Sequence, residues 1–506
     1  MATRLRRISQ ILFFVVFSVL LVRAKLFNFS GADRRPAIPV NPFFKVDPLA
    51  SSVNLLAGNA LYSELAWSLL ILIPTVFLGR FFCGWICPLG SLNHFLDGIR
   101  SKSMRRKTRI AANRYKKWQA TKYFLLIAGL LAALGRSSIL GWIDPFSLFV
   151  RSMGVSILPA ASSKKYYVVY QPHYWPTVVI GAVFLALLLM NLRVTRFWCR
   201  ALCPLGALLG VASRLSILGL HKDAATCNKC SRCLTDCQGG DDPIGGVPWH
   251  KTECHLCLNC VEACPHGSLA FRFSRSFQTP PGVVGTSLSR RKTLAAMVTG
   301  FAVAPLLRAQ TGLGKRRNER LIRPPGALDE TDFLARCIRC GECMRVCPND
   351  ALHPAITETG LEGLWSPLVT PKIGYCEPSC ALCSEVCHTG AILELTPRKK
   401  GWIAGNNAAS TPMRIGTAVY DHQLCLPWAK ATECVVCLEW CPVMPKAIYI
   451  KAAELVDAEG KPCTLKQPYI DPGRCVGCGA CEFSCPLQDQ PGVCVTSAGE
   501  SRSLHR

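Results

Sequence analysis

One feature constrains the fold of this chain more than any other: an arginine–aromatic–cysteine stretch that occurs twice. The stretch at 80–90, with Cys83 and Cys87, returns in register at 196–206, with Cys199 and Cys203. Each copy follows a long apolar run, and each cysteine pair is followed at once by a proline. Two cysteines four residues apart lie on one face of a helix, and the proline ends that helix. The duplication therefore predicts two apolar helices that carry paired thiols at the same edge.

Four apolar runs are close to the roughly 20 residues that a bilayer requires. They cover Ile8–Leu26, Leu61–Phe82, Tyr123–Ile143 and Trp175–Leu192. Between the second and third runs, residues 100–117 contain nine Lys and Arg residues and no acid, which is typical of a cytoplasmic loop. This pattern predicts an α-helical membrane domain of four spans over 1–220. It also places both thiol pairs on the cytoplasmic side, and it explains much of the net charge of +26 without nucleic acid.

The next stretch, 221–272, carries two cysteine runs with the spacing of a bacterial two-cluster ferredoxin. In that arrangement, three cysteines of one run and the last cysteine of the other hold each [4Fe-4S] cluster. We therefore expect a cytoplasmic ferredoxin domain with two ligand sets, Cys227, Cys230, Cys233 and Cys264 for one and Cys254, Cys257, Cys260 and Cys237 for the other. Gln238 stands where a proline usually follows the fourth cysteine, and this leaves the ligand set intact.

Residues 273–326 form a linker that is rich in small and basic residues around a short apolar run. Ser289-Arg290-Arg291-Lys292-Thr293 before that run resembles a twin-arginine export signal, with Thr293 in place of the usual aromatic residue. The run is shorter than a normal span, and Pro305 interrupts it. Three interpretations remain open: an internal export signal, a fifth membrane segment, or a basic linker at the membrane surface.

The stretch 327–506 contains four further cysteine runs and predicts a four-cluster ferredoxin-like α+β domain. The second run has one extra residue in its first gap, and the first cysteine of the third run is displaced onto a loop. Four runs can pair in three ways, and the spacing does not choose among them. The expected ligands are Cys337, Cys340, Cys343 and Cys347; Cys376, Cys380, Cys383 and Cys387; Cys425, Cys434, Cys437 and Cys441; and Cys475, Cys478, Cys481 and Cys485.

The spacing of these runs favours [4Fe-4S] clusters over other uses of cysteine, and it predicts six clusters in all. A zinc ribbon has two cysteine pairs separated by a long loop, whereas here a third cysteine follows after two residues. Disulfides would be an alternative in an oxidising compartment, and folding around clusters before export removes that conflict. Haem attachment is disfavoured because no Cys-x-x-Cys-His occurs.

Two groups near the membrane are candidates for chemistry. The duplicated thiols Cys83, Cys87, Cys199 and Cys203 predict a redox-active or metal-binding site, with buried packing as the alternative. Arg80 and Arg196 are expected to extend toward the membrane interface. Ionisable residues in or beside the outer ends of the spans are functional candidates by default. Glu64, Asp144 and His173 are therefore nominated as proton acceptors for a quinol.

These motifs resemble two known families. Four spans, two Cys-x3-Cys-Pro copies and a two-cluster tail are similar to the NapH membrane subunits of quinol dehydrogenases. A twin-arginine start before four cluster runs, with the stretched second and looped third, resembles the MauM/NapG ferredoxin-type proteins. The resemblance implies a fusion that acts as a quinol dehydrogenase component. It would oxidise quinol from the quinone pool and pass electrons to a periplasmic reductase, such as nitrate reductase, or to its cytochrome subunit.

The same resemblance implies a multi-pass protein of the bacterial inner membrane, with the first ferredoxin domain cytoplasmic and the last domain periplasmic. Two alternatives remain open. All clusters could be cytoplasmic, with electrons passing from a soluble donor into quinone. The membrane thiols could instead reduce or bind a metal for the assembly of another enzyme, as in CcoG- or NosR-like proteins, which share the membrane module.

Overall fold

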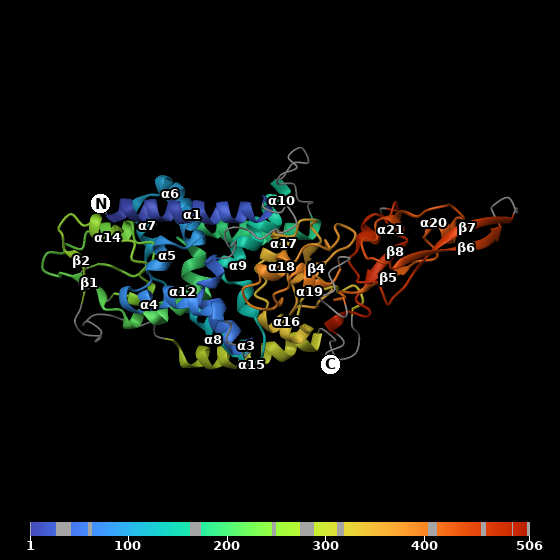
Figure 1. Ribbon diagram of the computed structural model, residues 1–506. Coiled ribbons are helices and arrows are strands. Elements are labelled where there is room, and N and C mark those ends of the chain that lie inside the picture. Colours follow the sequence, from blue (N-terminus) through green and yellow to red (C-terminus); the bar gives the residue numbers. More distant parts are fainter. Residues whose placement is uncertain are drawn as a thin grey trace. The chain divides into compact units, whose positions relative to one another are not determined.

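The computed structural model describes residues 2–26, 42–58, 63–161, 174–244, 249–273, 288–310, 318–402, 412–456, 462–487 and 489–502. The chain divides into two compact units, each assembled from three segments. Unit 1 contains Met1–Leu21, Asn41–Met153 and Val178–Pro305, and unit 2 contains Val22–Val40, Gly154–Thr177 and Leu306–Arg506. Unit 1 is mainly helical, whereas most of the strands belong to unit 2 (Figure 1).

Unit 1 is built on short helices because glycine, proline and basic turns interrupt its apolar runs. Gly79, with φ of 98°, ends the helix before Arg80, and Pro88 and Pro204 each begin a new helix after the duplicated cysteines. The principal helices are α1 (Ala2–Leu26, in unit 1 to Leu21), α3 (Pro48–Gly58), α4 (Leu69–Leu78), α5 (Phe81–Trp85), α6 (Pro88–Ser103), α7 (Arg106–Asn113), α8 (Thr121–Leu134), α9 (Pro145–Val150), α11 (Val178–Leu189), α12 (Pro204–Ala212) and α15 (Arg290–Gln310).

Two helical segments of the described chain are long and apolar enough to cross a membrane, namely Ala2–Lys25 and Trp175–Leu192. They correspond to the first and fourth predicted spans. The second and third predicted spans form shorter helices, Ala66–Leu78 and α8, because Gly79 and Gly135 end them early. The prediction of four spans is therefore not confirmed, because only two of the predicted segments form such helices in the part of the chain that is described. Large apolar side chains on α1 are exposed, among them Ile8, Ile11 and Val15.

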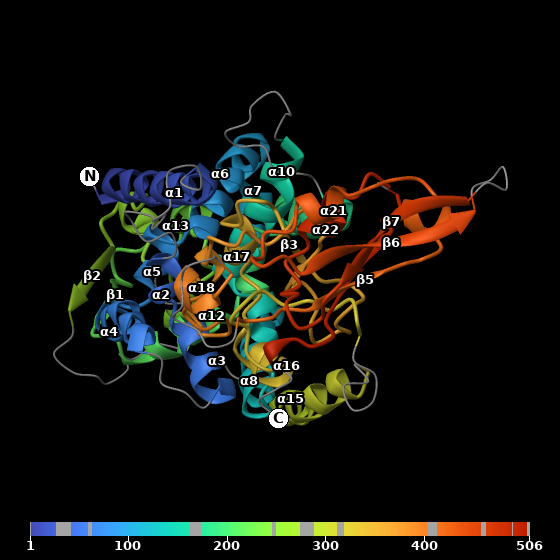
Figure 2. The ribbon, with the colours of Figure 1, turned by 45° about the vertical axis from the view of Figure 1, so that its right-hand side comes forward.

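Helix α15 contains the linker's apolar run and packs against α8 through small residues (Figures 1 and 2). A methyl group at Gly300 would lie 2.5 Å from the carbonyl oxygen of Ala128, and one at Gly135 would lie 3.0 Å from Cβ of Ala304. Higher residue numbers on α15 thus meet higher numbers on α8, so the two helices run in the same direction. Leu294, Val298 and Phe301 on α15 are each at least 60% exposed.

The described cysteine runs are organised in three modules, each closed by an antiparallel contact between its ends. The first module (218–273) is closed by β1 (Leu218–Lys222) and β2 (Leu269–Phe273) in unit 1. In unit 2 the second module (327–392) is closed by a bridge between Ala327 and Ile392, and the third (417–496) by β5 (Thr417–Tyr420) and β8 (Val493–Thr496).

The modules of unit 2 contain further strand pairs. The second module contains β3 (Leu352–Pro354) paired with β4 (Pro367–Val369). In the third, β6 (Ile448–Val456) and β7 (Pro462–Ile470) form a long hairpin between its two cysteine runs (Figure 1). β6 thus begins seven residues after Cys441, the last cysteine of the third run.

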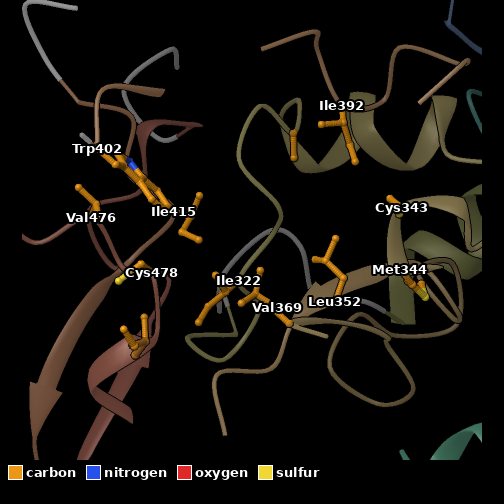
Figure 3. Close-up of a cluster of buried hydrophobic side chains, with 14 of the residues drawn as sticks. Ile322, Cys343, Met344, Leu352, Val369, Ile392, Trp402, Ile415, Val476 and Cys478 are labelled. Atoms are coloured by element: carbon orange, nitrogen blue, oxygen red, sulfur yellow. The ribbon is translucent and has the colours of Figure 1, made fainter. Parts of the chain in front are cut away.

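One hydrophobic core joins the second and third modules. It places Met344, Leu352 and Val369 of the second module with Ile415 and Val476 of the third (Figure 3). Cysteines of both modules, including Cys343 and Cys478, belong to the same buried cluster. The thiols therefore lie in apolar surroundings, which exclude water from any group that they bind.

Candidate iron–sulfur and thiol sites

The regular cysteine runs share an unusual backbone. The residue after the second cysteine has positive φ in four runs, at Ser231, Leu258, Gly341 and Gly479. The residue before that cysteine also has positive φ, at Lys229, Leu256, Arg339 and Gly477. For the residues other than glycine this conformation costs about 1–2 kcal/mol each, and such strain concentrates at functional sites. Successive turns of this kind direct backbone N–H groups into the loop, which suits an anionic group.

Four small cavities are each lined by four cysteines, and each set combines three from one run with the last of its partner run. Their thiols are Cys227, Cys230, Cys233 and Cys264; Cys337, Cys340, Cys343 and Cys387; Cys425, Cys434, Cys437 and Cys485; and Cys441, Cys475, Cys478 and Cys481. We call each such set of four thiols a quartet. The pairing that spacing alone left open is thus first run with second, and third run with fourth.

Electrostatic contacts bring together the remaining cysteines. The pKa of Cys347 is raised to about 12, first by burial, then by the charge of Asp350, and then by Cys376 and Cys380. Burial likewise raises the pKa of Cys383, beside Cys376 and Cys380, with Cys347 contributing as well. In the first module, burial raises the pKa of Cys237, and Cys257 adds to the shift. These neighbours complete two more quartets, Cys347 with Cys376, Cys380 and Cys383, and Cys237 with Cys254, Cys257 and Cys260.

The quartets fit [4Fe-4S] clusters in donor chemistry. The described cysteines are all free thiols. Backbone N–H groups donate to several ligand sulfurs, for example from Ala351 to Cys347 at 3.2 Å and from Ile392 to Cys387 at 3.3 Å. Such hydrogen bonds stabilise thiolates and tune the potential of a bound cluster. Among the described residues, no three His, Cys, Asp or Glu side chains converge at the spacing of a single metal ion. Each quartet instead offers the four thiolates that a [4Fe-4S] cluster requires.

The duplicated stretch is used in the same way in both copies. Cys87 caps the N-terminus of α6, and its Sγ accepts a hydrogen bond from the N–H of Gly90 at 3.4 Å. Cys203 caps α12, and its Sγ accepts from the N–H of Gly206 at 3.2 Å. The copies differ before the cap: Cys83 lies in the short α-helix α5, whereas Cys199 lies in a π-helical turn at Trp198–Leu202. Such turns are frequent at functional sites.

The four thiols of the two copies lie together in unit 1. Burial raises the pKa of the Cys87 thiol, and the neighbouring Cys199 and Cys83 raise it further. Cys203 behaves likewise, with the same two neighbours. Arg196 is 1% exposed, and its three side-chain nitrogens have no hydrogen-bond partner among the described residues. A buried guanidinium beside four thiols is costly unless an anionic group balances it.

Arg80 is also buried, so the expectation that Arg80 and Arg196 extend to the membrane interface is wrong. The guanidinium of Arg80 donates to the carbonyl oxygen of Thr252 at 2.7 Å and lies 3.7 Å from the carboxylate of Glu253. Glu253 directly precedes Cys254. For Arg80 the physical reason is that buried carbonyl and carboxylate groups of the first module bind its guanidinium. The duplicated stretch therefore lies against a ferredoxin ligand loop.

Asp144 is buried and has a partner that the sequence reasoning missed. It caps α9, accepting from the N–H of Ser147 at 2.8 Å, while Asp47 caps α3. Burial raises the pKa of Asp47, and the charge of Asp144 and a hydrogen bond between the two carboxyl groups raise it further. The two carboxyl groups therefore lie close enough to interact with each other. Of the other nominated acceptors, Glu64 lies in a short 3-10 helix (Ser63–Ser68) with its side chain outside the described part, and His173 is outside the described residues.

A sequence signal for Asp47 was present, because both aspartates precede a proline that begins a helix. Asp47-Pro48 and Asp144-Pro145 each come before one copy of the duplicated stretch. The first copy and the helix that Asp144 caps also meet in space. The rings of Phe82 and Phe146 lie 5.8 Å apart, which joins the loop of Cys83 to the helix that Asp144 caps.

Family models match three parts of the chain, all described as 4Fe-4S binding domains. One covers 61–107 and 174–221, and so includes both copies of the duplicated stretch. The second covers 333–353 and the third 466–487, which contain the first and last cysteine runs of unit 2. These matches confirm that the chain carries several 4Fe-4S binding domains.

Comparison with known proteins finds ferredoxin-type relatives. The chain is 34% identical over 210 residues to the methylamine utilization ferredoxin-type protein MauM of Methylorubrum extorquens, covering 40% of this chain and 86% of that one. It is 32% identical over 176 residues to the ferredoxin-type protein NapG of Escherichia coli, covering 34% and 69%. It is 29% identical over 220 residues to the protein NirI of Paracoccus denitrificans, covering 40% and 29%. No solved structure matches.

Proposed function

The chain belongs to the family of ferredoxin-type electron transport proteins that includes MauM and NapG, and from this premise we propose that it is a membrane-bound quinol dehydrogenase component. Its quinol-derived electrons would leave through [4Fe-4S] clusters to a partner reductase. A NapH-like membrane module would be fused to a MauM/NapG-type ferredoxin in one chain.

The observation that carries this proposal is the group of four cavities, spread over three modules, that are each lined by four cysteines. Together with the two quartets inferred from the remaining cysteines, they would hold six clusters, two in each module, with the crossed ligand pattern given above. Bound [4Fe-4S] clusters supply one-electron transfer at potentials that depend on their surroundings. The chain's own contribution is to bury the thiols in apolar cores and to supply backbone N–H donors. The first module would receive electrons at the membrane, and the other two would deliver them.

The packing of α15 supports a crossing of the membrane before unit 2. Residues 100–117 are strongly basic, and the first module contacts α7 there: Arg109 lies 2.7 Å from the carboxylate of Asp236. Because α15 runs in the same direction as α8, its basic start at Arg290 lies at the end of α8 nearer this loop. We infer that α15 carries the chain across the membrane, as an export signal or a fifth segment, although it is less apolar than Ala2–Lys25 and Trp175–Leu192. The clusters of unit 2 would then be periplasmic.

The duplicated thiols are proposed as a redox-active or metal-binding site next to the first module. These four thiols lie beside the buried guanidinium of Arg196. Arg80, in the same stretch, lies 3.7 Å from the carboxylate of Glu253, which directly precedes Cys254. Asp144 is retained as a proton acceptor together with Asp47, because two interacting carboxyl groups can take up or release a proton. Glu64 and His173 remain proposed acceptors from the sequence.

Anaerobic mixing of the purified protein with a reduced short-chain quinone analogue tests the proposal. We expect the bound clusters to be reduced, which is seen as a decrease of their visible absorbance in proportion to the quinone formed. A protein with its full iron content that dithionite reduces but quinol does not would overturn quinol oxidation.

Two competing functions have separate tests. A reporter enzyme that is active only outside the cytoplasm, fused to the C-terminus, should be active if unit 2 is exported. Activity only from a cytoplasmic reporter would favour electron transfer from a soluble donor into quinone. A metal-handling role predicts that copper reduction, but not quinol oxidation, depends on the duplicated thiols.

A further inference from the structure

Unit 1 contains a large cavity that the sequence did not reveal. Its volume is about 920 Å³, and it lies between α1, α6 and the first ferredoxin module. One part of its wall is apolar, with Ile11 and Phe14 from α1 and Phe95 and Ile99 from α6. The volume is within the range of sites that bind small organic molecules.

The polar part of the wall is a hydrogen-bonded chain of three side chains. His94 Nδ1 lies 2.7 Å from Oε1 of Gln238, and Nε2 of Gln238 donates to Oδ2 of Asp97 at 3.1 Å. An amide oxygen can only accept, so Nδ1 of His94 carries the hydrogen. In the neutral ring, Nε2 is then an acceptor. Burial, and next the charge of Arg196, lower the pKa of His94 to about 3, so the ring is neutral.

This polar part lies against the ligand loops of the first module. Asp236 and Gln238, both in the cavity wall, flank Cys237 in the chain. Asn259 and Ala263 in the same wall directly precede Cys260 and Cys264. A molecule in the cavity would therefore contact residues that are direct neighbours in the chain of Cys237, Cys260 and Cys264. These cysteines belong to both quartets of the module. Short separation is what electron transfer from a bound donor requires.

The cavity opens between apolar side chains. Ile11 is 64% exposed, Phe95 65% and Ile99 57%. Arg7 and Lys102 lie in the same wall, so the opening is at the end of α1 and α6 that carries the basic residues. An occupant must therefore have an apolar tail for the opening and hydrogen-bonding groups for the inner end.

We propose that this cavity is the quinol-binding site, with the head group at His94 and Asp97 and the isoprenoid tail leaving between α1 and α6. The inference rests on the proposed function and assigns its site. In the reaction, both O–H bonds of the hydroquinone break and it becomes the quinone. One proton passes through Nε2 of His94, whose low pKa releases it to water, the other goes to the carboxylate of Asp97, and two electrons go singly to two iron–sulfur acceptors. Gln238 is a positioning residue, because it fixes the tautomer of His94.

Filling the cavity tests the site directly. Gly98 lines it, and a Cβ atom added there meets no atom within 4 Å, so Gly98→Trp begins in open space at the cavity wall. Binding of decyl-benzoquinone to the intact protein is measured by calorimetry. We expect Gly98→Trp to weaken binding by at least about tenfold. The matched control Ser103→Trp, exposed at the end of the same helix and outside the cavity wall, should bind as the wild type does.

A photoreactive azidoquinone provides the second readout and should label peptides of α1 or α6. Iron content and dithionite reduction of Gly98→Trp should match the wild type, which shows that the variant folds. If the wild type oxidises quinol and labelling maps elsewhere, or Gly98→Trp binds normally, the site is wrong while the proposed function stands. If the wild type neither binds nor oxidises quinol, the proposed function itself fails. Labelling that detergent or phospholipid alone abolishes would identify a lipid cavity and overturn the assignment.

His94→Gln separates chemistry from packing. Glutamine can still donate to Gln238 but is not a base, so quinone binding should change less than about threefold while quinol oxidation falls by about 10²–10⁴. Gln238→Glu should shift the pH profile of oxidation, because a carboxylate in place of the amide favours the protonated imidazole. A loss of binding equal to the loss of rate in His94→Gln would indicate a structural role only.

Discussion

The molecule assembles four thiols in two different ways. In the ferredoxin modules, a tight loop supplies three cysteines and the partner run supplies the fourth, so each quartet combines near and distant ligands. In the duplicated stretch, each copy supplies two cysteines, one of which caps a helix. The first arrangement depends on loop conformation, with left-handed residues such as Leu258 beside the second cysteine. The second depends on bringing two helix ends together, so it depends on the whole of unit 1.

This difference teaches which sulfur sites can be recognised from spacing. Three cysteines in seven residues define most of a site locally. A Cys-x3-Cys pair defines only half of one, and its charge balance comes from Arg196 and Arg80, whose positions depend on packing. A ferredoxin site defined by one loop should tolerate substitutions elsewhere in the chain. The site of the duplicated thiols should be disturbed by substitutions that change the packing of unit 1.

The largest expected effect is the loss of a ferredoxin ligand. Cys478→Ser removes one thiolate from the quartet of Cys441, Cys475 and Cys481, whose sulfurs share the core of unit 2. We expect the loss of about four iron atoms per chain, measured by iron and acid-labile sulfide analysis. The control is Cys494→Ser, at an exposed cysteine outside every quartet, which should keep all its iron. Equal iron in both variants would contradict the assigned ligand set.

Serine at both Cys83 and Cys199 addresses the other kind of site. Because these thiols belong to no ferredoxin quartet, the iron of the six clusters should remain. Quinol-driven reduction should fall by at least about tenfold if the duplicated site takes part, as stopped-flow absorbance would show. Unchanged reduction would show that these thiols only pack the helix ends.

A smaller effect tests the local character of the ferredoxin loops. Gly479 has φ of 88°, and a methyl group there would lie 2.9 Å from Cβ of Pro371. Gly479→Ala should lower the free energy of unfolding of unit 2 by about 1–2 kcal/mol. In the stretched run, Ala381 follows the second cysteine with φ of −135°, so Ala381→Gly should cost only about 0.5–1 kcal/mol of chain entropy. Denaturant unfolding compares the two, and a larger cost for Ala381→Gly would contradict the argument.

The smallest effect concerns the carboxyl pair beside the duplicated stretch. The pKa of Asp47 is raised in the folded protein. The protonated carboxyl group therefore stabilises the fold at low pH, and this stabilisation is lost as the pH rises through the raised pKa. Asp47→Asn removes this ionisation, so the melting temperature should fall less than in the wild type as the pH rises above about 3.8, the ordinary pKa of an aspartate. Identical pH profiles would show that the carboxyl groups do not interact.

Much of the ferredoxin part could be predicted from the sequence, because its ligands are set by spacing. In the first module, the expected exchange of the last cysteine between the two runs agrees with the cavity that Cys227 and Cys264 both line. The pairing of the last four runs could not be predicted, since it depends on which chain ends meet, as Ala327 meets Ile392. The contact of Asp47 with Asp144 and the cavity beside His94 also needed the fold. Each joins residues far apart in the sequence, although the repeated Asp-Pro pairs were a usable signal.

The partial agreement on membrane spans has a similar origin. Hydropathy detects apolar runs but not where a helix ends inside them, and Gly79 ends α4 within the second run. The same break turns Arg80 inward to Thr252 instead of outward. Charge position remained informative, since the basic loop and the first module lie together at Arg109 and Asp236.

The most direct test of the account is the iron and acid-labile sulfide content of the anaerobically purified protein, determined per chain. Six quartets predict about 24 iron atoms and an equal amount of sulfide, with no zinc. Iron well below that amount, or zinc in its place, would contradict the assignment of the six quartets to [4Fe-4S] clusters.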